Sequence, residues 1–402
     1  MLLNGSPLTF AKRLLAAAAV AATAMSAQAQ DIKIGFNADQ SGTGAAELGV
    51  AARHGFDLAI EDLNKAGGVL GKQLVGVVRD DTGSPPKSIQ NMTELIDSEK
   101  VVAVIGPTNS GNALAWLHIP QQKKVPVIVP VATATEITRR YANDPQNFIY
   151  RISMVDREQV ALLVAYAVKS SKSRKIAIIG DSTGFGQQGI KDLTEVLALH
   201  GVERAAVAKF GPKDTDMTSQ LARIKESGAD TLIVYGLADA NAQLLRSMEK
   251  VNYFPTTLGT WGNMSTKLIE IAGPKLAEQM IFATSIAEDS NPRAAALAKR
   301  VRVRYPQMAT FVSAAQAYDS VMLLAAAIKK AGTTDGAKVA ETLDSGVPPT
   351  EGIVKTYTKP FTKTEHDALT VADFHLARWH NGVVTAYQDD ITKSLKPADL
   401  KK

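Results

Sequence analysis

The stretch VIGPTNSGNALAW, residues 104–116, joins three kinds of local sequence in one short run. Its first residues are apolar and β-branched as in a buried strand, its middle is a loop of small residues, and its end is typical of a helix. A strand that passes through such a loop into a helix is half of a βαβ unit, the building block of parallel sheets. Backbone N–H groups at the helix start and the hydroxyl of Ser110 would face one spot, which favours an anion: a phosphate, a carboxylate or an oxyanion.

The same alternation continues over nearly the whole chain. A first series of short apolar runs lies at 32–36, 73–80, 101–106 and 125–130, and a second at 175–180, 205–210, 230–236 and 256–260. Amphipathic segments separate these runs, as expected for helices between parallel strands. The pattern predicts an α/β protein with two Rossmann-like lobes, each built on a parallel sheet.

The last third of the chain predicts several crossings between the lobes. Helix-like stretches at 291–305 and 312–331 extend one lobe, and a hairpin with its turn at His380-Asn381-Gly382 completes the other. Several crossings form a multi-strand hinge, and a hinge places a cleft between the lobes. The predicted boundaries are 1–29 for a signal peptide, 30–152 plus 283–352 for the first lobe, 153–282 plus 353–390 for the second, and 391–402 for a basic, solvated tail.

The first 29 residues have the parts of a secretory signal peptide. Lys12 and Arg13 precede the apolar run LLAAAAVAATAM, and Ala27-Gln28-Ala29 forms an A-x-A cleavage site. The apolar run is short for a membrane anchor, which needs ~20 apolar residues. The chain has no cysteine, which excludes disulfides, thiol chemistry and a lipid-carrying cysteine behind the signal. We therefore expect an exported protein of the bacterial periplasm.

Charge and loop composition narrow the class of ligand. The formal net charge of +5 includes the two cations of the signal peptide, so the rest of the chain is only weakly basic and no nucleic-acid partner is expected. Ligands of open α/β sheets bind beyond the carboxyl ends of the strands, and the loops there are rich in Ser, Thr, Asn and Gly. Such loops suit a small polar head group. They lie at 38–48, 107–112, 131–135, 181–187, 237–241 and 261–265.

Two patterns in residues 180–189 raise the alternative of an enzyme. Residues 184–189 match the dinucleotide fingerprint G-x-G-x-x-G, but they begin four residues beyond Gly180, and the next strand ends without an acid for a ribose. Residues 180–184 match the nucleophile elbow G-x-S-x-G, which needs a helix directly after Ser182, and the following glycines are expected to delay that helix. A hydrolase is the alternative that remains. The histidines show no metal or catalytic spacing, so we expect no catalytic residue, metal or cofactor.

Motifs in order along the chain resemble a known family. They are IGFNADQSGTGAAELG, AIEDLNKAGGVLGKQL followed by DDTGSPPKSI, VIGPTNSGNA, PVIVPVATATEIT, KIAIIGDSTGFGQQG and SGADTLIVYG. With them, residues 31 to about 390 resemble the periplasmic substrate-binding proteins of branched-chain amino acid ABC transporters. The resemblance implies the two-lobed type I fold, a small-molecule ligand, an inner-membrane ABC permease as partner and a monomeric receptor that is not an enzyme.

The resemblance also implies how the acid end of a ligand is held. In the family, the loop after the third strand offers a serine hydroxyl and backbone to the α-carboxylate of the ligand, and the matching residue is Ser110. The P-x-A-T segment contributes a carbonyl and a threonine that hold the carboxylate and the ammonium, here Val131 and Thr133. Charge-assisted hydrogen bonds of ~1.5–3 kcal/mol each can neutralise a carboxylate without a basic side chain.

The amine end departs from the family pattern. Trp261 stands where a glutamate is expected, Phe185 is the expected aromatic residue without a hydroxyl, and Leu48 replaces a tyrosine of the first loop. Glu47 and Asp239 are the remaining acids for an ammonium, and a helix N-cap is the other explanation of Asp239. An aromatic or other hydrophobic organic acid therefore stays an alternative to leucine, isoleucine or valine, and a sensor domain would have the same fold.

Overall fold

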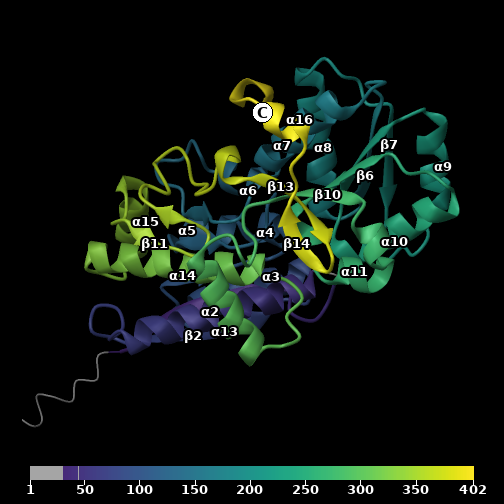
Figure 1. Cartoon of the computed structure of the whole chain (residues 1–402). Helices are drawn as coiled ribbons and strands as arrows, with labels where there is room; N and C mark the ends of the chain where they lie inside the picture. Colours follow the sequence, from purple (N-terminus) through teal and green to yellow (C-terminus); the bar gives the residue numbers. More distant parts are fainter. Residues whose placement is uncertain (1–29, 44) are drawn as a thin grey trace, which may run out of the picture.

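The computed structural model describes residues 30–43 and 45–402, which form two α/β lobes lying side by side (Figure 1). The purple and blue N-terminal part and the yellow-green helices form one lobe, and the teal part forms the other together with the yellow hairpin. The signal peptide expected at 1–29 lies outside the described residues. Among the described residues, no helix is long and apolar enough to cross a lipid bilayer.

The first lobe is built on a five-stranded parallel sheet in the order β2-β1-β3-β4-β5. Its strands are β1 (Ile32–Ala38), β2 (Leu74–Asp80), β3 (Ala103–Ile105), β4 (Val127–Val129) and β5 (Ile149–Arg151). Its helices are α2 (Ala46–Lys65), α3 (Pro85–Thr93), α4 (Ser110–Trp116), α5 (His118–Lys123), α6 (Glu136–Arg139), α13 (Pro292–Arg304), α14 (Val312–Ala331) and α15 (Gly336–Ser345). Both late helices lie on this lobe: α14 packs along α2, and Arg300 of α13 pairs with Asp62 of α2.

The second lobe has a seven-stranded sheet in the order β14-β13-β10-β9-β8-β6-β7. Its strands are β6 (Ile176–Asp181), β7 (Ala206–Phe210), β8 (Thr231–Tyr235), β9 (Thr256–Gly259), β10 (Met280–Thr284), β13 (His375–His380) and β14 (Val383–Ala386). Its helices are α7 (Asp156–Ser170), α8 (Gly184–Leu199), α9 (Thr218–Glu226), α10 (Ala238–Lys250), α11 (Lys267–Ala272), α12 (Pro274–Ala277) and α16 (Asp390–Ser394). The first five strands are parallel, and β13 and β14 are antiparallel additions at one edge.

Burial explains why the apolar periodicity predicts the central strands so well. Every residue of β6 and of β8 is buried, because helices cover both faces of a parallel sheet. The edge strand β7 instead alternates between half-buried and exposed residues. The predicted hairpin turn is confirmed: Asn381 and Gly382 both have positive φ, as a two-residue turn between twisted strands requires.

The third chain crossing comes later than the predicted boundary at 353. The Tyr357 hydroxyl donates to Asp319 of α14 over 2.9 Å, and Arg151 of β5 donates to Asp367 over 2.7 Å, so this segment lies on the first lobe. Within residues 353–359, the structure has one short strand, β12 (Thr356–Tyr357), which pairs with β11 (Thr350–Glu351) in a sheet of two strands among the described residues. The segment is held mainly by polar contacts to α14, such as the bond from Tyr357 to Asp319, rather than by pairing in a large sheet.

Two further expectations are corrected. The glycines after Ser182 do not delay helix α8, which begins at Gly184, because the Thr183 side chain accepts a hydrogen bond from the Gly186 N–H and caps the helix. The C-terminal tail is not simply solvated: Lys402 pairs with Glu158 on α7, and the leucines of the tail pack against the core. Apolar burial and charge pairing hold the tail on the second lobe.

Candidate functional site

A cavity of about 260 Å³ lies between the two lobes, at the carboxyl ends of their parallel strands. This volume is somewhat below the ~300–1,000 Å³ of pockets for drug-sized ligands, so it suits a small molecule. The cavity includes all the predicted site residues except Glu47: Leu48, Ser110, Val131, Thr133, Phe185, Asp239 and Trp261. The first four come from the first lobe and the last three from the second, so a molecule in the cavity touches both lobes.

The first-lobe wall of the cavity has the features of a carboxylate cradle. Ser110 is buried at the start of α4, and its Oγ accepts a hydrogen bond from the Ala134 N–H over 3.3 Å. Because the oxygen is used as an acceptor there, the hydroxyl proton remains available to a ligand. Among the described residues, the carbonyl of Val131 and the N–H of Thr133 have no hydrogen-bond partner.

One part of the predicted cradle is different in the structure. The side chain of Asn109 accepts hydrogen bonds from the N–H groups of Gly111 and Asn112 over 2.8 and 3.3 Å. The helix start therefore satisfies its own donors with an N-cap, and these two N–H groups do not point at a ligand. The donors that stay free on this wall are the Ser110 hydroxyl and the N–H of Thr133.

The cavity has an apolar wall formed by both lobes. Leu48 from α2 and Phe185 from α8 line it together with Trp261. The Phe185 ring lies against Tyr235, with ring centroids 4.8 Å apart, which fixes its orientation. The Trp261 side chain is buried, and its indole N–H has no partner among the described residues. This wall suits the apolar body of a ligand.

The charged residues that line the cavity are two acids, Asp181 and Asp239, and among the described residues no lysine, arginine or histidine lines it. Burial raises the pKa of Asp181, whose carboxylate accepts from the Thr183 N–H over 2.8 Å. Asp239 is the second residue of α10 and accepts from the Ala240 N–H over 2.9 Å. The N-cap of α10 is Leu237, so the N-cap explanation of Asp239 is wrong.

Glu47 lies beside the cavity but does not line it. It is in the first turn of α2, and its Oε2 is buried without a hydrogen-bond partner among the described residues. Burial, and then the nearby charge of Asp239 on the other lobe, raise the pKa of Glu47 to about 7. Glu47 is thus an acid of the first lobe that the second lobe covers, and it belongs to the lobe contact rather than to the cavity wall.

The set of loops predicted to face the ligand does not include those after β2 and β7, which also line the cavity. Gly83 and Pro85 follow the carboxyl end of β2, and Pro212 follows that of β7. The rule that ligands bind beyond the carboxyl ends of parallel strands applies to these loops as well and would have found them. Thr108 and Asn112, by contrast, lie in the loop 107–112, which the sequence predicts to face the ligand.

Contacts across the cleft show that the lobes are closed on each other. Helices α4 and α8 meet at two glycines, and a Cβ placed on Gly184 would lie 3.0 Å from the Cα of Gly111. Nearer the hinge, the Thr135 hydroxyl donates to Asp192 of α8 over 2.8 Å. A cavity enclosed by two closed lobes, with polar groups on both, defines a two-lobed binding protein that holds a small ligand in its cleft.

Comparisons with known proteins give the family. The chain belongs to the periplasmic binding proteins, whose family model matches residues 31–383. It is similar to the leucine-, isoleucine-, valine-, threonine- and alanine-binding protein of Pseudomonas aeruginosa, with 28% identity over 92% of this chain and 95% of the relative. It is 25% identical to Leu/Ile/Val-binding protein homolog 3 of Brucella melitensis, over 94% of this chain and 99% of the relative.

Solved structures show the same fold. The branched-chain amino acid transporter substrate-binding protein LivJ of Streptococcus pneumoniae, in complex with isoleucine, superposes with a TM-score of 0.77, at 24% identity over 89% of this chain and 98% of the other. The leucine-binding protein LivK of Thermotoga maritima gives a TM-score of 0.78 at 22% identity, with 89% and 98% covered. The predicted type I fold is therefore confirmed.

Proposed function

We propose that this protein is a periplasmic receptor that captures a hydrophobic α-amino acid between its lobes and presents it to an inner-membrane ABC permease. The charge of the cavity is the observation that carries the proposal: of the residues that the structure describes, two carboxylates and no cation line it. A buried charge needs a partner, so this cavity favours a ligand that brings its own positive charge. An α-amino acid does so, whereas an aromatic or other organic acid would add a further negative charge.

The two ends of the ligand have separate partners in this proposal. The carboxylate lies on the first lobe, at the Ser110 hydroxyl and the Thr133 N–H. The ammonium lies toward Asp239 and the carbonyl of Val131. The apolar side chain lies among Leu48, Phe185 and Trp261, and the names of the relatives, which bind leucine, isoleucine and valine, support this choice.

The receptor is exported to the periplasm and acts there as a single chain in this proposal. Residues 1–29 export the chain as a cleaved signal peptide, and the receptor acts as a monomer without covalent chemistry. The hydrolase alternative finds no support in the cavity: Ser182 is exposed and does not line it. Closure requires a ligand that contacts both lobes, because a ligand shifts a conformational equilibrium only by its differential affinity for the two states.

Thermal unfolding in the presence of matched ligands tests the ligand class. L-leucine, L-isoleucine, L-valine and L-phenylalanine are compared with 4-methylpentanoate, which is leucine without its amino group, and with phenylacetate. A ligand at 100 times its Kd should stabilise the protein by ~2.7 kcal/mol. We expect L-leucine to stabilise and 4-methylpentanoate not to. Equal stabilisation by the two would refute a role for the ammonium, and no shift with any amino acid would refute the receptor proposal.

The Asp239→Asn variant sharpens this test. It should weaken L-leucine binding by ~1.5–3 kcal/mol, the contribution of a hydrogen bond to a charged group, and should improve binding of 4-methylpentanoate by removing a negative charge. Opposite shifts for the two ligands identify Asp239 as the partner of the ammonium. Loss of both ligands alike would show that the substitution damages the cavity instead.

A further inference from the structure

The loop that carries Val131 and Thr133 is hydrogen-bonded to the first segment that crosses between the lobes, residues 151–156, which we call the crossing. Three successive carbonyls of this loop accept hydrogen bonds from three residues of the crossing. The pairs are Ser153 Oγ to the Ala132 carbonyl at 3.0 Å, the Asp156 N–H to the Thr133 carbonyl at 2.8 Å, and Arg151 Nη1 to the Ala134 carbonyl at 2.8 Å. A loop held at three consecutive residues has little freedom to move relative to the crossing.

The crossing leaves free the groups that the ligand needs. The Val131 carbonyl and the Thr133 N–H have no partner among the described residues, and the Ala134 N–H turns the Ser110 hydroxyl into a donor. Rotation of a peptide unit moves a C=O and the N–H of the next residue together. The bond to the Ala132 carbonyl therefore fixes the Thr133 N–H, the bond to the Thr133 carbonyl fixes the Ala134 N–H, and the bond from Arg151 to the Ala134 carbonyl anchors the end of the loop. The crossing thus sets the direction in which the cradle faces.

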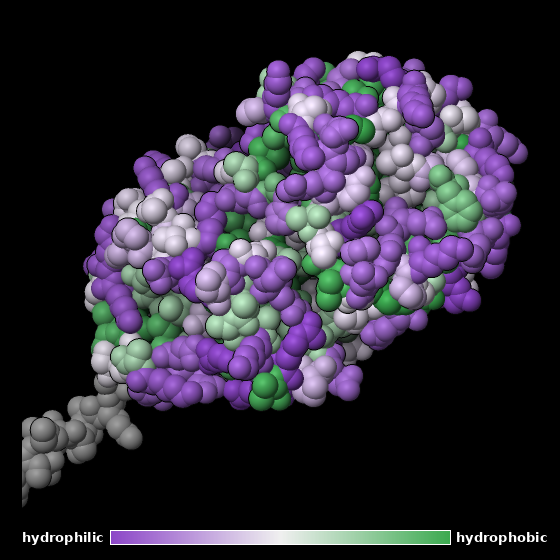
Figure 2. Space-filling model, viewed as in Figure 1, coloured by the Kyte–Doolittle hydropathy of each residue, from purple (hydrophilic) through white to green (hydrophobic). Residues whose placement is uncertain are grey.

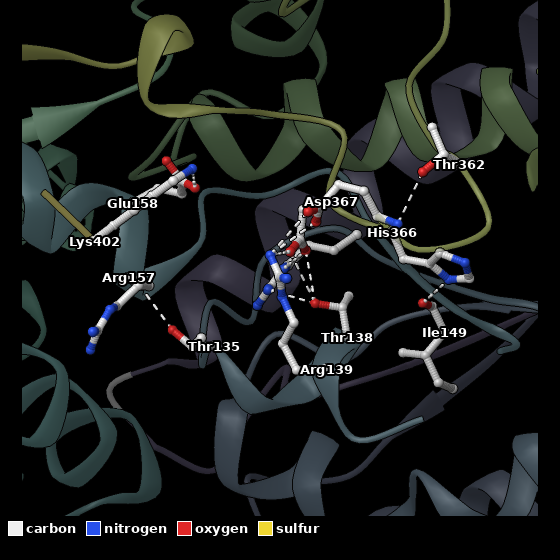
Figure 3. Close-up of polar contacts among 12 residues, drawn as sticks. Thr135, Thr138, Arg139, Ile149, Arg157, Glu158, Thr362, His366, Asp367 and Lys402 are labelled. Atoms are coloured by element: carbon white, nitrogen blue, oxygen red, sulfur yellow. Dashed lines mark hydrogen bonds and ion pairs between the residues drawn. The ribbon is translucent and has the colours of Figure 1, made fainter. Parts of the chain in front are cut away.

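Arg151 also ties the loop to the segment that leads to the third crossing. Its side chain is fully buried, and besides the Ala134 carbonyl its guanidinium donates to Asp367 over 2.7 Å and to the Thr138 hydroxyl over 3.0 Å. Figure 3 shows Asp367 next to Thr138 and Arg139, on the segment that leads to the third crossing. The backbone of Arg151 also pairs with this segment, by bonds to His366 and from Ala368.

The geometry of the guanidinium distinguishes positioning from simple charge neutralisation. A lysine would neutralise Asp367, but only the planar fork of an arginine reaches a carboxylate, a hydroxyl and a carbonyl in three fixed directions. A buried ion pair by itself is weak evidence for stability, because desolvation of both charges offsets much of their attraction. The third donor, directed at the Ala134 carbonyl, therefore points to a role in the cradle.

We propose that Arg151 is a positioning residue for ligand capture, whose guanidinium fixes the 131–135 loop against two of the segments that join the lobes. The loop then presents the Val131 carbonyl and the Thr133 N–H correctly when the hinge is in its closed geometry. This inference rests on the proposed function and adds a residue that does not touch the ligand. It predicts that removal of the Arg151 guanidinium changes both the affinity for the ligand and the mobility of residues 131–135.

The test compares Arg151→Lys with Thr138→Val in the full receptor. Arg151→Lys keeps the charge beside Asp367 and removes the donor to the Ala134 carbonyl. Thr138→Val perturbs the same buried cluster, because the Thr138 hydroxyl bonds both Arg151 and Asp367, but it leaves the loop's carbonyls paired. Three quantities are measured: the Kd for L-leucine by calorimetry, the free energy of unfolding in urea, and amide hydrogen exchange of residues 131–135.

We expect Arg151→Lys to weaken L-leucine binding about tenfold, which is ~1.4 kcal/mol, and to accelerate exchange in residues 131–135. Thr138→Val should lower stability while leaving the Kd within about twofold, the scatter of independent sites. If Arg151→Lys does not fold, Ser153→Ala removes the donor to the Ala132 carbonyl with a smaller change and should shift binding and exchange in the same direction.

Two results would overturn the proposal. The first is that Arg151→Lys and Thr138→Val both lose affinity in proportion to their loss of stability. The second is that Arg151→Lys and Ser153→Ala both keep wild-type affinity and wild-type exchange in residues 131–135. If the wild-type receptor itself does not bind L-leucine, the proposed ligand class fails, whereas the exchange comparison needs no ligand and still decides whether Arg151 positions the loop.

Discussion

The contact between Gly111 and Gly184 allows one substitution to act on the closed form alone. In the Gly184→Ala variant, the new Cβ would lie 3.0 Å from the Cα of Gly111 and 3.3 Å from its nitrogen. Two carbon atoms are best separated by ~3.5–4.0 Å, so the methyl group is ~0.5–1 Å too close. Both contacts are with backbone, so the start of α4 or of α8 has to shift before the lobes can close.

Overpacking of this kind costs ~1–3 kcal/mol, and here the cost falls on the closed form. Since 1.4 kcal/mol is a factor of ten, the Kd for L-leucine should rise ~5- to 150-fold. The free energy of unfolding of the ligand-free protein should not fall, because open lobes do not make the contact and alanine is a better helix former than glycine by ~1 kcal/mol. Calorimetry and urea unfolding measure the two effects separately.

Gly111→Ala is the matched control, because it adds the same methyl group on the other side of the contact. Its Cβ would lie 4.0 Å from the nitrogen of Gly184, an ordinary contact, and 3.2 Å from the side chain of Asn109, which requires only a small shift. Both glycines line the cavity, so a direct clash with the ligand would weaken both variants. Equal losses, or wild-type affinity in Gly184→Ala, would refute closure through the glycine pair.

Three further outcomes follow from the site. Burial in this closed structure raises the pKa of Glu47 from its ordinary value of 4.5 to about 7. Opening of the lobes should expose Glu47 and return its pKa toward 4.5, so L-leucine affinity should increase as the pH falls from about 7 to 5, and Glu47→Gln should remove that dependence in calorimetry at several pH values. Ser110→Ala removes a charge-assisted hydrogen bond and should weaken L-leucine binding by ~1.5–3 kcal/mol in calorimetry; it also leaves the buried Ala134 N–H without its acceptor, so the urea midpoint should fall. Trp261→Ala removes a large side chain from the apolar wall and enlarges the cavity, so L-phenylalanine should gain affinity relative to L-valine in a competition assay. An unchanged ratio of the two affinities would show that Trp261 does not contact the ligand.

Figure 2 shows the surface of one face of the molecule. This face is mostly hydrophilic (purple), and hydrophobic residues (green) are visible where the two lobes meet and at scattered outer positions. The residues proposed to bind the ligand are largely buried in the cleft, Ser110 and Trp261 among them. The hydrophobic surface visible on this face therefore does not by itself mark the proposed binding site.

The class of protein could be predicted from sequence because its determinants are local. Runs of valine and isoleucine alternating with amphipathic segments specify parallel strands and helices, and the Asn381-Gly382 pair specifies a hairpin turn through φ alone. The cavity-lining positions of Ser110, Val131 and Thr133 follow from the same local logic, since loops after parallel strands share one edge of a sheet. Their roles toward a ligand remain predictions.

Only the tertiary structure determines which groups that are far apart in the sequence form hydrogen bonds and ion pairs with each other. Arg151 and Asp367 meet although 216 positions separate them, because the chain crosses between the lobes more than once. The same crossings bring the two lobes together, so that Glu47 is covered by the other lobe, and they hold the carbonyls of the cradle loop. Such pairings depend on which segments the crossings bring together, and no local pattern of residue types encodes them.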